Sequence, residues 1–192
     1  MALILKGTTV KKLVTNGIVC KECIAKGVSI FKAVTELYNK GQNVPWTGFA
    51  ISQNGSSVSK TDGGTYLHAS VHGGWEGNYN AHDGAGWYTK NKVKIDGGKL
   101  QFVWDRQTNW SSYNWIKFGI CSSVNTTDLV NGGGAWVKSK TYGQGETQAT
   151  NATDTIDLTG VSGEYYVVAV AYVSYKNARG ANFKIYNCNI IN

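Results

Sequence analysis

The chain has 192 residues, a formal net charge of +7, 24 glycines, a single proline and only 16% charged residues. This length fits one large domain, or one domain with a small appendage. The glycine content and the 12% of aromatic residues argue against a helical bundle and favour many short strands joined by turns. We therefore expect an all-β protein that buries a substantial core without disulfide cross-links.

The positive charge is concentrated at the N-terminus. Residues 1–40 hold seven Lys and two Glu, whereas residues 41–192 hold twelve Lys or Arg and ten Asp or Glu. A basic segment is typical of contact with nucleic acid or an acidic protein, and the alternative is a solvent-exposed Lys face. The segment contains no Arg and no dense basic run, so we expect no specific nucleic-acid binding. We interpret residues 1–40 as a docking segment, with these anchor candidates: Lys11, Lys12, Lys21, Lys26 and Phe31.

This segment contains a weak ten-residue repeat. Residues 14–20 align with residues 24–30, and each copy carries a glycine after a small or polar residue. The pairs Asn16-Gly17 and Lys26-Gly27 predict tight turns between short strands. Such hairpins bury little by themselves, so we expect another surface to order them. Residues 31–40 are expected to be a short helix or a linker to a main domain that starts near residue 41.

Nine runs in the main domain are rich in β-branched and aromatic residues and are bounded by turn residues, which is typical of strands. They are Phe49–Gln53, Tyr66–Val71, Trp87–Ile95, Leu100–Trp104, Trp115–Cys121, Ala135–Lys138, Thr155–Leu158, Tyr165–Val173 and Phe183–Ile191. Residues 165–173 are apolar at almost every position, which predicts a central strand covered on both faces. The pattern predicts an antiparallel β-sandwich of jelly-roll type over residues 41–192.

Four cysteines lie at irregular spacing. Cys20 and Cys23 form a C-x-x-C pair, which is compatible with a zinc or redox site, but no second close pair accompanies it. Cys121 and Cys188 lie in strand-like runs, where a free thiol behaves as a small apolar group. We expect no bound metal and no cofactor, and a reducing intracellular site of assembly.

The N-terminus carries no adequate secretion signal, because Lys6 and Gly7 interrupt the apolar residues 1–5. No apolar stretch approaches the length needed to cross a membrane. We therefore expect no membrane insertion.

No catalytic motif is present among those for phosphate binding, serine nucleophiles, zinc proteases or dinucleotides. Asp83 and Asp105 are an imaginable acid/base pair, but nothing in the sequence brings them together. His68 and His72 lie four residues apart and, with His82 and Asp83, offer an alternative metal site; surface histidine pairs are the simpler interpretation. We expect a protein that is not an enzyme.

Two loop-like regions combine aromatic and polar residues, at positions 73–87 and 104–115. Flat aromatic faces beside carboxylates and amides suit sugar recognition, and they suit protein interfaces equally well. The alternative is that the tryptophans fill the core, and we expect about half of the seven to do so. The candidate ligand-binding residues are Trp75, Glu76, Tyr79, His82, Asp83, Arg106, Trp110 and Tyr113.

Three segments carry a resemblance to a known group. The run V-K-K-L-V-T-N-G-I-V-C-K-E-C-I-A-K-G-V resembles short N-terminal segments of tailed-bacteriophage virion proteins. The endings I-D-L-T-G-V-S-G-E-Y-Y-V-V-A-V-A-Y and F-K-I-Y-N-C-N-I look like closing strands of jelly-roll domains on phage tail and appendage proteins. The run K-V-K-I-D-G-G-K-L-Q-F is similar to the central strand pair of those domains. The resemblance implies a structural virion protein that is assembled in the host cytoplasm and forms homo-oligomers, and it transfers no site residue.

The sequence therefore yields one main hypothesis and two alternatives. The main hypothesis is a bacteriophage virion component of the tail, baseplate or capsid surface. Its N-terminal segment would bind other virion proteins, and its sandwich would contact host-surface polysaccharide. The first alternative is a free carbohydrate-binding module or lectin. The second is a polysaccharide hydrolase, which requires two acidic residues in one cleft.

Overall fold

The computed structural model describes residues 34–53, 55–72, 82–108, 113–143, 147–174 and 180–192, and the backbone of four short strands before them. These strands are β1 (Val14–Thr15), β2 (Ile18–Val19), β3 (Glu22–Ala25) and β4 (Val28–Lys32). β1 pairs with β2 and β3 with β4, each across two intervening residues, as the predicted turns require. The anchor candidates Lys11, Lys12, Lys21 and Lys26 lie outside the described residues, and only the backbone of Phe31 is described, in β4.

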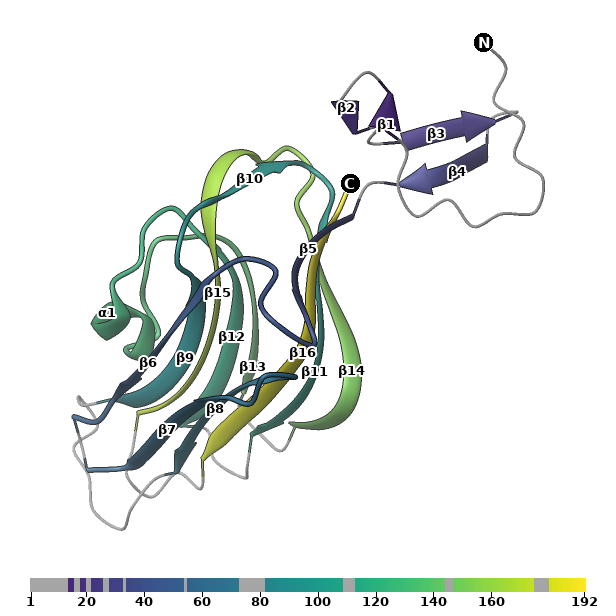
Figure 1. The fold of residues 1–192 in the computed structure, drawn as a ribbon. Coiled ribbons are helices and arrows are strands. Elements are labelled where there is room, and N and C mark those ends of the chain that lie inside the picture. The colour runs from purple at the N-terminus through teal and green to yellow at the C-terminus, as the bar shows by residue number, and fades with distance from the viewer. Residues whose placement is uncertain are drawn as a thin grey trace.

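Two antiparallel sheets form a β-sandwich of jelly-roll type, which confirms the predicted fold class (Figure 1). Sheet I has the strand order β13-β12-β15-β9-β6, with β10 also pairing with β15. Its strands are β6 (Trp46–Ile51), β9 (Asp83–Thr89), β10 (Val93–Asp96), β12 (Asn114–Cys121), β13 (Trp136–Gly143) and β15 (Ser162–Val173). Sheet II has the order β14-β11-β16-β8-β7, with β5 also pairing with β16. Its strands are β5 (Val34–Asn39), β7 (Ser57–Asp62), β8 (Leu67–His72), β11 (Lys99–Thr108), β14 (Thr147–Asp157) and β16 (Ala181–Ile191).

The main core fills the space between the sheets. Strand alternation points apolar side chains of β11 and β16 inward to meet those of sheet I. Trp104, which is fully buried, lies at the centre of an aromatic cluster with Phe102, Phe118 and Phe183, at ring-centroid distances of 4.8–5.8 Å. Edge-on and tilted ring contacts of this kind stabilise a core beyond the burial of area alone.

β15 is a central strand covered on both faces, as its unbroken apolar run predicts. Its inward residues, such as Val167 and Ala169, belong to the core between the sheets. Its outward residues, such as Val168 and Val170, belong to a second apolar cluster on the outer face of sheet I. The short helix α1 (Thr126–Val130) covers this cluster with Leu129 and Val130, and its N-terminus is capped by Asn125.

Glycines make room for this second cluster. A Cβ built on Gly86 would lie 2.8 Å from the Phe49 ring and closer still to the carbonyl oxygen of Ala169 in β15. A Cβ on Gly84 would lie 2.6 Å from Val130 of α1. Side chains at these two positions of β9 would therefore push the covering residues off the sheet.

The structure differs from the predicted elements in several places. Residues 34–39 are a strand, β5, where a helix or linker was expected: Leu37 and Tyr38 are fully buried, so the sandwich begins before residue 41. Strand β7 was not predicted, because its sequence, SVSKTD, is polar and almost entirely exposed at a sheet edge. The predicted strand over residues 87–95 is divided into β9 and β10.

Cys121 and Cys188 are free and buried in the sandwich, and burial raises the pKa of both thiols. They behave as apolar residues, as predicted. No helix in the described part of the chain is long and apolar enough to cross a membrane.

Candidate functional site

Three neighbouring strand pairs of sheet II lose their regular register within a short stretch of the sheet. Between β11 and β16 the pairing steps from Val103↔Asn187 to Trp104↔Ile185, so Tyr186 has no partner on β11. Between β11 and β14 the register shifts between Trp104 and Arg106. Between β16 and β5 it shifts between Cys188 and Asn189. Bulges of this kind bend a strand and re-aim its side chains, and they are frequent next to binding sites.

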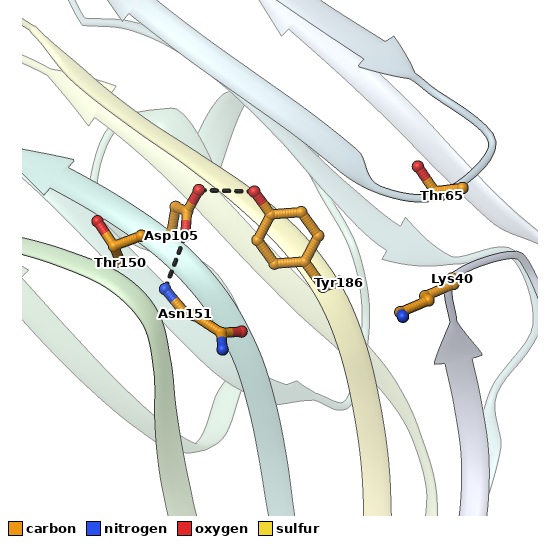
Figure 2. A pocket seen from close by; sticks show the side chains of 6 residues that line it. All are labelled: Lys40, Thr65, Asp105, Thr150, Asn151 and Tyr186. Carbon is orange, nitrogen blue, oxygen red and sulfur yellow. Dashed lines mark hydrogen bonds between the residues drawn. The ribbon is translucent and has the colours of Figure 1, made fainter.

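A groove of about 510 Å³ lies over these bulges, on the outer face of sheet II. Its lining residues come from five parts of the chain: Lys40, Thr65, Asp105, Thr150, Asn151 and Tyr186. Figure 2 shows the Tyr186 ring between Asp105 and Asn151 on one side and Lys40 and Thr65 on the other. The groove thus combines one aromatic ring with hydroxyl, amide, carboxylate and ammonium groups.

Asp105 organises one wall of the groove. Its carboxylate accepts a hydrogen bond from the Tyr186 hydroxyl at 2.6 Å and one from the backbone N–H of Asn151 at 2.7 Å. The hydrogen bond to Asp105 is the main cause that raises the pKa of Tyr186 to about 12. The phenol therefore stays protonated through the physiological pH range. A carboxylate has room for about four acceptor contacts, so Asp105 retains capacity for ligand hydroxyl groups.

The backbone is strained on both sides of the groove. Lys40 and Asn151 both have φ of +49°, and they are the non-glycine residues with left-handed φ in the described ranges. Lys40 is held there by its N–H, which donates to the carbonyl of Tyr186 at 3.0 Å. A left-handed φ lowers stability at a non-glycine residue, and residues with such a φ tend to cluster at functional sites. That both line one groove is the second observation that points to it as a binding site.

A smaller hollow of about 170 Å³ adjoins the groove and shares Asp105 and Thr150 with it. It is rich in amides and charged groups, and its remaining lining residues are Arg106, Gln107, Gln148, Ala149, Asn182 and Lys184. Next to it, Tyr66 contacts Tyr186 edge-on, with ring centroids 6.4 Å apart, and the Lys184 ammonium lies 5.3 Å from the centre of the Tyr66 ring. The two hollows together form a trough, with Tyr186 in its lining and Tyr66 packed against Tyr186.

The guanidinium of Arg106, a predicted ligand-binding residue, is engaged within the protein. Its Nε donates to Asp154 at 3.0 Å, and its guanidinium carbon lies 3.7 Å from the centre of the Tyr142 ring. Asp154 also accepts hydrogen bonds from Trp104, Lys140 and the Tyr142 hydroxyl. Burial alone would raise the pKa of Asp154, but these donors hold it well below its usual range. This cluster joins β14 to β13 of the opposite sheet, so Arg106 stabilises the fold through it.

The other described candidates lie away from the groove, on or beside sheet I. The carboxylate of Asp83 is 1% exposed and accepts hydrogen bonds from the backbone N–H groups of Gln53 and Ser56. The His82 ring stacks near Tyr172 and contacts the carbonyl of Val130 at 3.1 Å. Tyr113 is 38% exposed. Trp75, Glu76, Tyr79 and Trp110 lie outside the described residues.

The positions of these residues bear on two alternatives raised by the sequence, an acid/base pair and a histidine metal site. Asp83 and Asp105 lie on different sheets and share no cleft, so they do not form the imagined acid/base pair. His68 and His72 lie on β8 of sheet II, whereas Asp83 begins β9 of sheet I. Among the described residues, no group of three His, Cys, Asp or Glu side chains could hold a metal ion.

Sequence reasoning missed the principal residues of the groove, Tyr186, Asn151 and Lys40. One pattern pointed to Tyr186. The buried positions of β16 alternate at 183 and 185 and again at 188 and 190. The step of three from 185 to 188, in place of two, marks a bulge at Tyr186. No pattern within residues 147–157 singles out Asn151, because its place depends on the pairing of β14 with β11.

No protein-family model matches the chain, and no curated protein matches its sequence significantly. Among solved structures, it is similar to the family 11 carbohydrate-binding module from Clostridium thermocellum in complex with a β-1,3-1,4-mixed-linked tetrasaccharide. The identity is 11%, the match covers 82% of this chain and 94% of that chain, and the TM-score is 0.42. A family 29 carbohydrate-binding module matches with 12% identity, coverage of 82% and 91%, and a TM-score of 0.36. An arabinose-bound α-L-arabinofuranosidase matches with 15% identity, coverage of 81% and 26%, and a TM-score of 0.41. At these identities and TM-scores, no residue of this chain takes a role from them.

Proposed function

We propose that the chain is a carbohydrate-binding protein that holds a glycan in the groove on the outer face of sheet II. The observation that carries this proposal is the arrangement of Tyr186, Asp105 and Asn151 at a line of bulges. A tyrosine ring offers an apolar face to the CH groups of a sugar, and the carboxylate and amide accept and donate to its hydroxyls. The groove therefore offers both an apolar ring face and polar groups, which is what the two faces of a sugar ring require.

A binding role fits the groove better than hydrolysis. Glycoside hydrolases that act by the common two-carboxylate mechanism need a pair of acidic residues on either side of the scissile bond. Asp105 is the one acidic residue among the described residues that line the groove and the adjoining hollow. Modules with bound oligosaccharides occur among the similar structures, as does a glycosidase, but at their TM-scores they do not decide between the two roles.

The test is calorimetric titration of the full chain with a panel of soluble oligosaccharides, repeated with Tyr186→Ala. We expect at least one oligosaccharide to bind and the variant to lose that binding. Tyr165→Ala is the matched control, since Tyr165 lies on β15 of sheet I, away from the groove. Binding that survives Tyr186→Ala would place the site elsewhere, and absence of binding across the panel would contradict the proposal.

We retain as a separate prediction that residues 1–40 dock the sandwich onto a bacteriophage virion, where the glycan would belong to the host surface. The described strands β1–β4 pair only within two hairpins, and two-stranded hairpins are marginal alone, so a partner surface would stabilise them. Light scattering of the full chain against residues 34–192 tests for self-assembly. A monomer in both cases would count against the homo-oligomer, and failure to co-purify with assembled particles would count against the virion.

A further inference from the structure

The trough contains two lysines that form no ion pair with a described carboxylate. Lys40 lines the groove and Lys184 lines the adjoining hollow. Arg106 and Lys140 form ion pairs with Asp154, and neither Lys40 nor Lys184 takes part in these pairs. This feature bears on which sugars the trough accepts.

Lys184 is the more informative of the two, because it is only partly exposed. Its ammonium lies over Tyr66 at 5.3 Å from the ring centre, a contact that fixes its position but leaves its charge uncompensated. Its field also acts on a neighbour: burial, and then the charge of Lys184, lower the pKa of His68. His68 therefore tends to be neutral beside Lys184, and the positive charge of this surface is concentrated on the lysine.

Asp105 restricts the kind of anion that could pair with the Lys40 and Lys184 ammonium groups. It lines both hollows, and its carboxylate would repel a small bare anion such as phosphate. A sugar that carries both hydroxyl and acidic groups avoids this conflict, because its hydroxyls donate to Asp105 while its anionic group lies toward Lys184. The amides of Gln107 and Asn182, which hydrogen-bond to each other at 3.4 Å, stand beside that position.

We propose that the ligand of the trough is an acidic glycan, whose sugar ring contacts Tyr186 and whose carboxylate pairs with Lys184. This inference rests on the proposed function and adds the substrate class. A uronic-acid polymer has this chemistry in each repeating unit, so consecutive units would reach both Lys184 and Lys40. Charge-assisted contacts of ammonium with carboxylate are stronger than neutral hydrogen bonds and weaken with added salt.

The experiment compares galacturonate oligomers with neutral galactose oligomers of the same length, by calorimetry with the full chain at low and at high sodium chloride. We expect the galacturonate oligomer to bind about tenfold tighter at low salt and to lose most of that preference at high salt. In Lys184→Gln we expect the preference to shrink, because the galacturonate oligomer loses its charge-assisted contact and so loses more affinity than the neutral oligomer does. Lys94→Gln is the control, because Lys94 is exposed on β10 of sheet I.

The outcomes separate the two proposals. Equal affinities for the acidic and neutral oligomers, or a preference that persists in Lys184→Gln, would overturn the acidic-glycan inference and leave the glycan-binding groove in place. Binding of inorganic phosphate as tight as that of the galacturonate oligomer would also overturn it. If neither oligomer nor any other glycan binds, the proposed function fails and the inference fails with it.

Discussion

The Tyr186 hydroxyl donates to the carboxylate of Asp105 at 2.6 Å, and the two residues belong to adjacent antiparallel strands of sheet II. Tyr186 is the residue that the bulge in β16 leaves without a partner on β11. The bulge therefore turns its side chain toward the outer face, and the hydrogen bond to Asp105 holds it there. This relationship makes the ring a fixed platform before any ligand arrives, which lowers the entropy lost on binding.

The two parts of Tyr186 should contribute differently to affinity. Tyr186→Ala removes the ring and should weaken glycan binding at least about tenfold, since stacking and burial of the ring are lost. Tyr186→Phe keeps the ring and should weaken binding only about threefold. The ring loses its hydrogen bond to Asp105, but this carboxylate can then accept a further hydrogen bond from the ligand, which offsets part of the loss. Calorimetry measures both. Tyr165→Phe serves as control, and a Tyr186→Phe variant as weak as Tyr186→Ala would show that the hydroxyl, and not the ring, carries recognition.

The strained turn at Lys40 predicts a conflict between stability and binding. Glycine adopts φ of +49° without steric cost, so Lys40→Gly should raise the free energy of unfolding by up to about 1 kcal/mol. The same change removes an ammonium group from the groove and should weaken binding of an acidic oligosaccharide. Urea denaturation and calorimetry give the two quantities.

Lys90→Gly is the matched control, because Lys90 is exposed and lacks a left-handed φ. It should lower stability slightly, through the greater freedom of glycine in the unfolded chain, and leave binding unchanged. A Lys40→Gly variant that is less stable than Lys90→Gly would contradict the role assigned to the turn.

The fold could be predicted from local patterns, whereas the groove could not. β15 was predictable because a strand buried on both faces must be apolar at every position. β7 was not, since an exposed edge strand carries no apolar alternation. The groove depends on two register shifts, which β11 makes with β14 and with β16 and which bring Asp105, Asn151 and Tyr186 together. Register between distant strands is a tertiary property.

The prediction for Arg106 shows the same limit. An arginine next to tryptophan and aspartate in the sequence suggested a ligand contact. Asp154, its actual partner, lies 48 residues further along the chain and is brought close only by the pairing of β14 with β11. Residue type alone does not distinguish a guanidinium that meets a ligand from one that closes the edge of a sandwich.

The glycines of β9 should be essential for the packing of the second apolar cluster on the outer face of sheet I. Gly86→Ala places a Cβ against the Phe49 ring and a β15 carbonyl, and we expect a loss of about 1–3 kcal/mol in the free energy of unfolding. Gly133→Ala is the control, since the nearest atom to its Cβ would be 3.3 Å away in an exposed loop. Equal stabilities of the two variants in urea would contradict the close packing described for β9.

Asp154 should make the stability of the protein dependent on acid pH. Its side chain is 10% exposed and receives Arg106 and Lys140, so Asp154→Asn should cost about 3 kcal/mol at pH 7. Because its pKa in the folded state lies well below the unfolded value of about 3.9, the carboxylate stabilises the fold above that value. As the pH falls below about 4 toward the folded-state pKa, this contribution is progressively lost. Urea unfolding of wild type and variant from pH 7 to pH 2 should show their stabilities converging.

Glu164→Gln, at an exposed position of β15, should stay within about 0.5 kcal/mol of wild type throughout. A gap between Asp154→Asn and wild type that is as wide at pH 2 as at pH 7 would mean that packing, and not charge, holds β13 and β14 together.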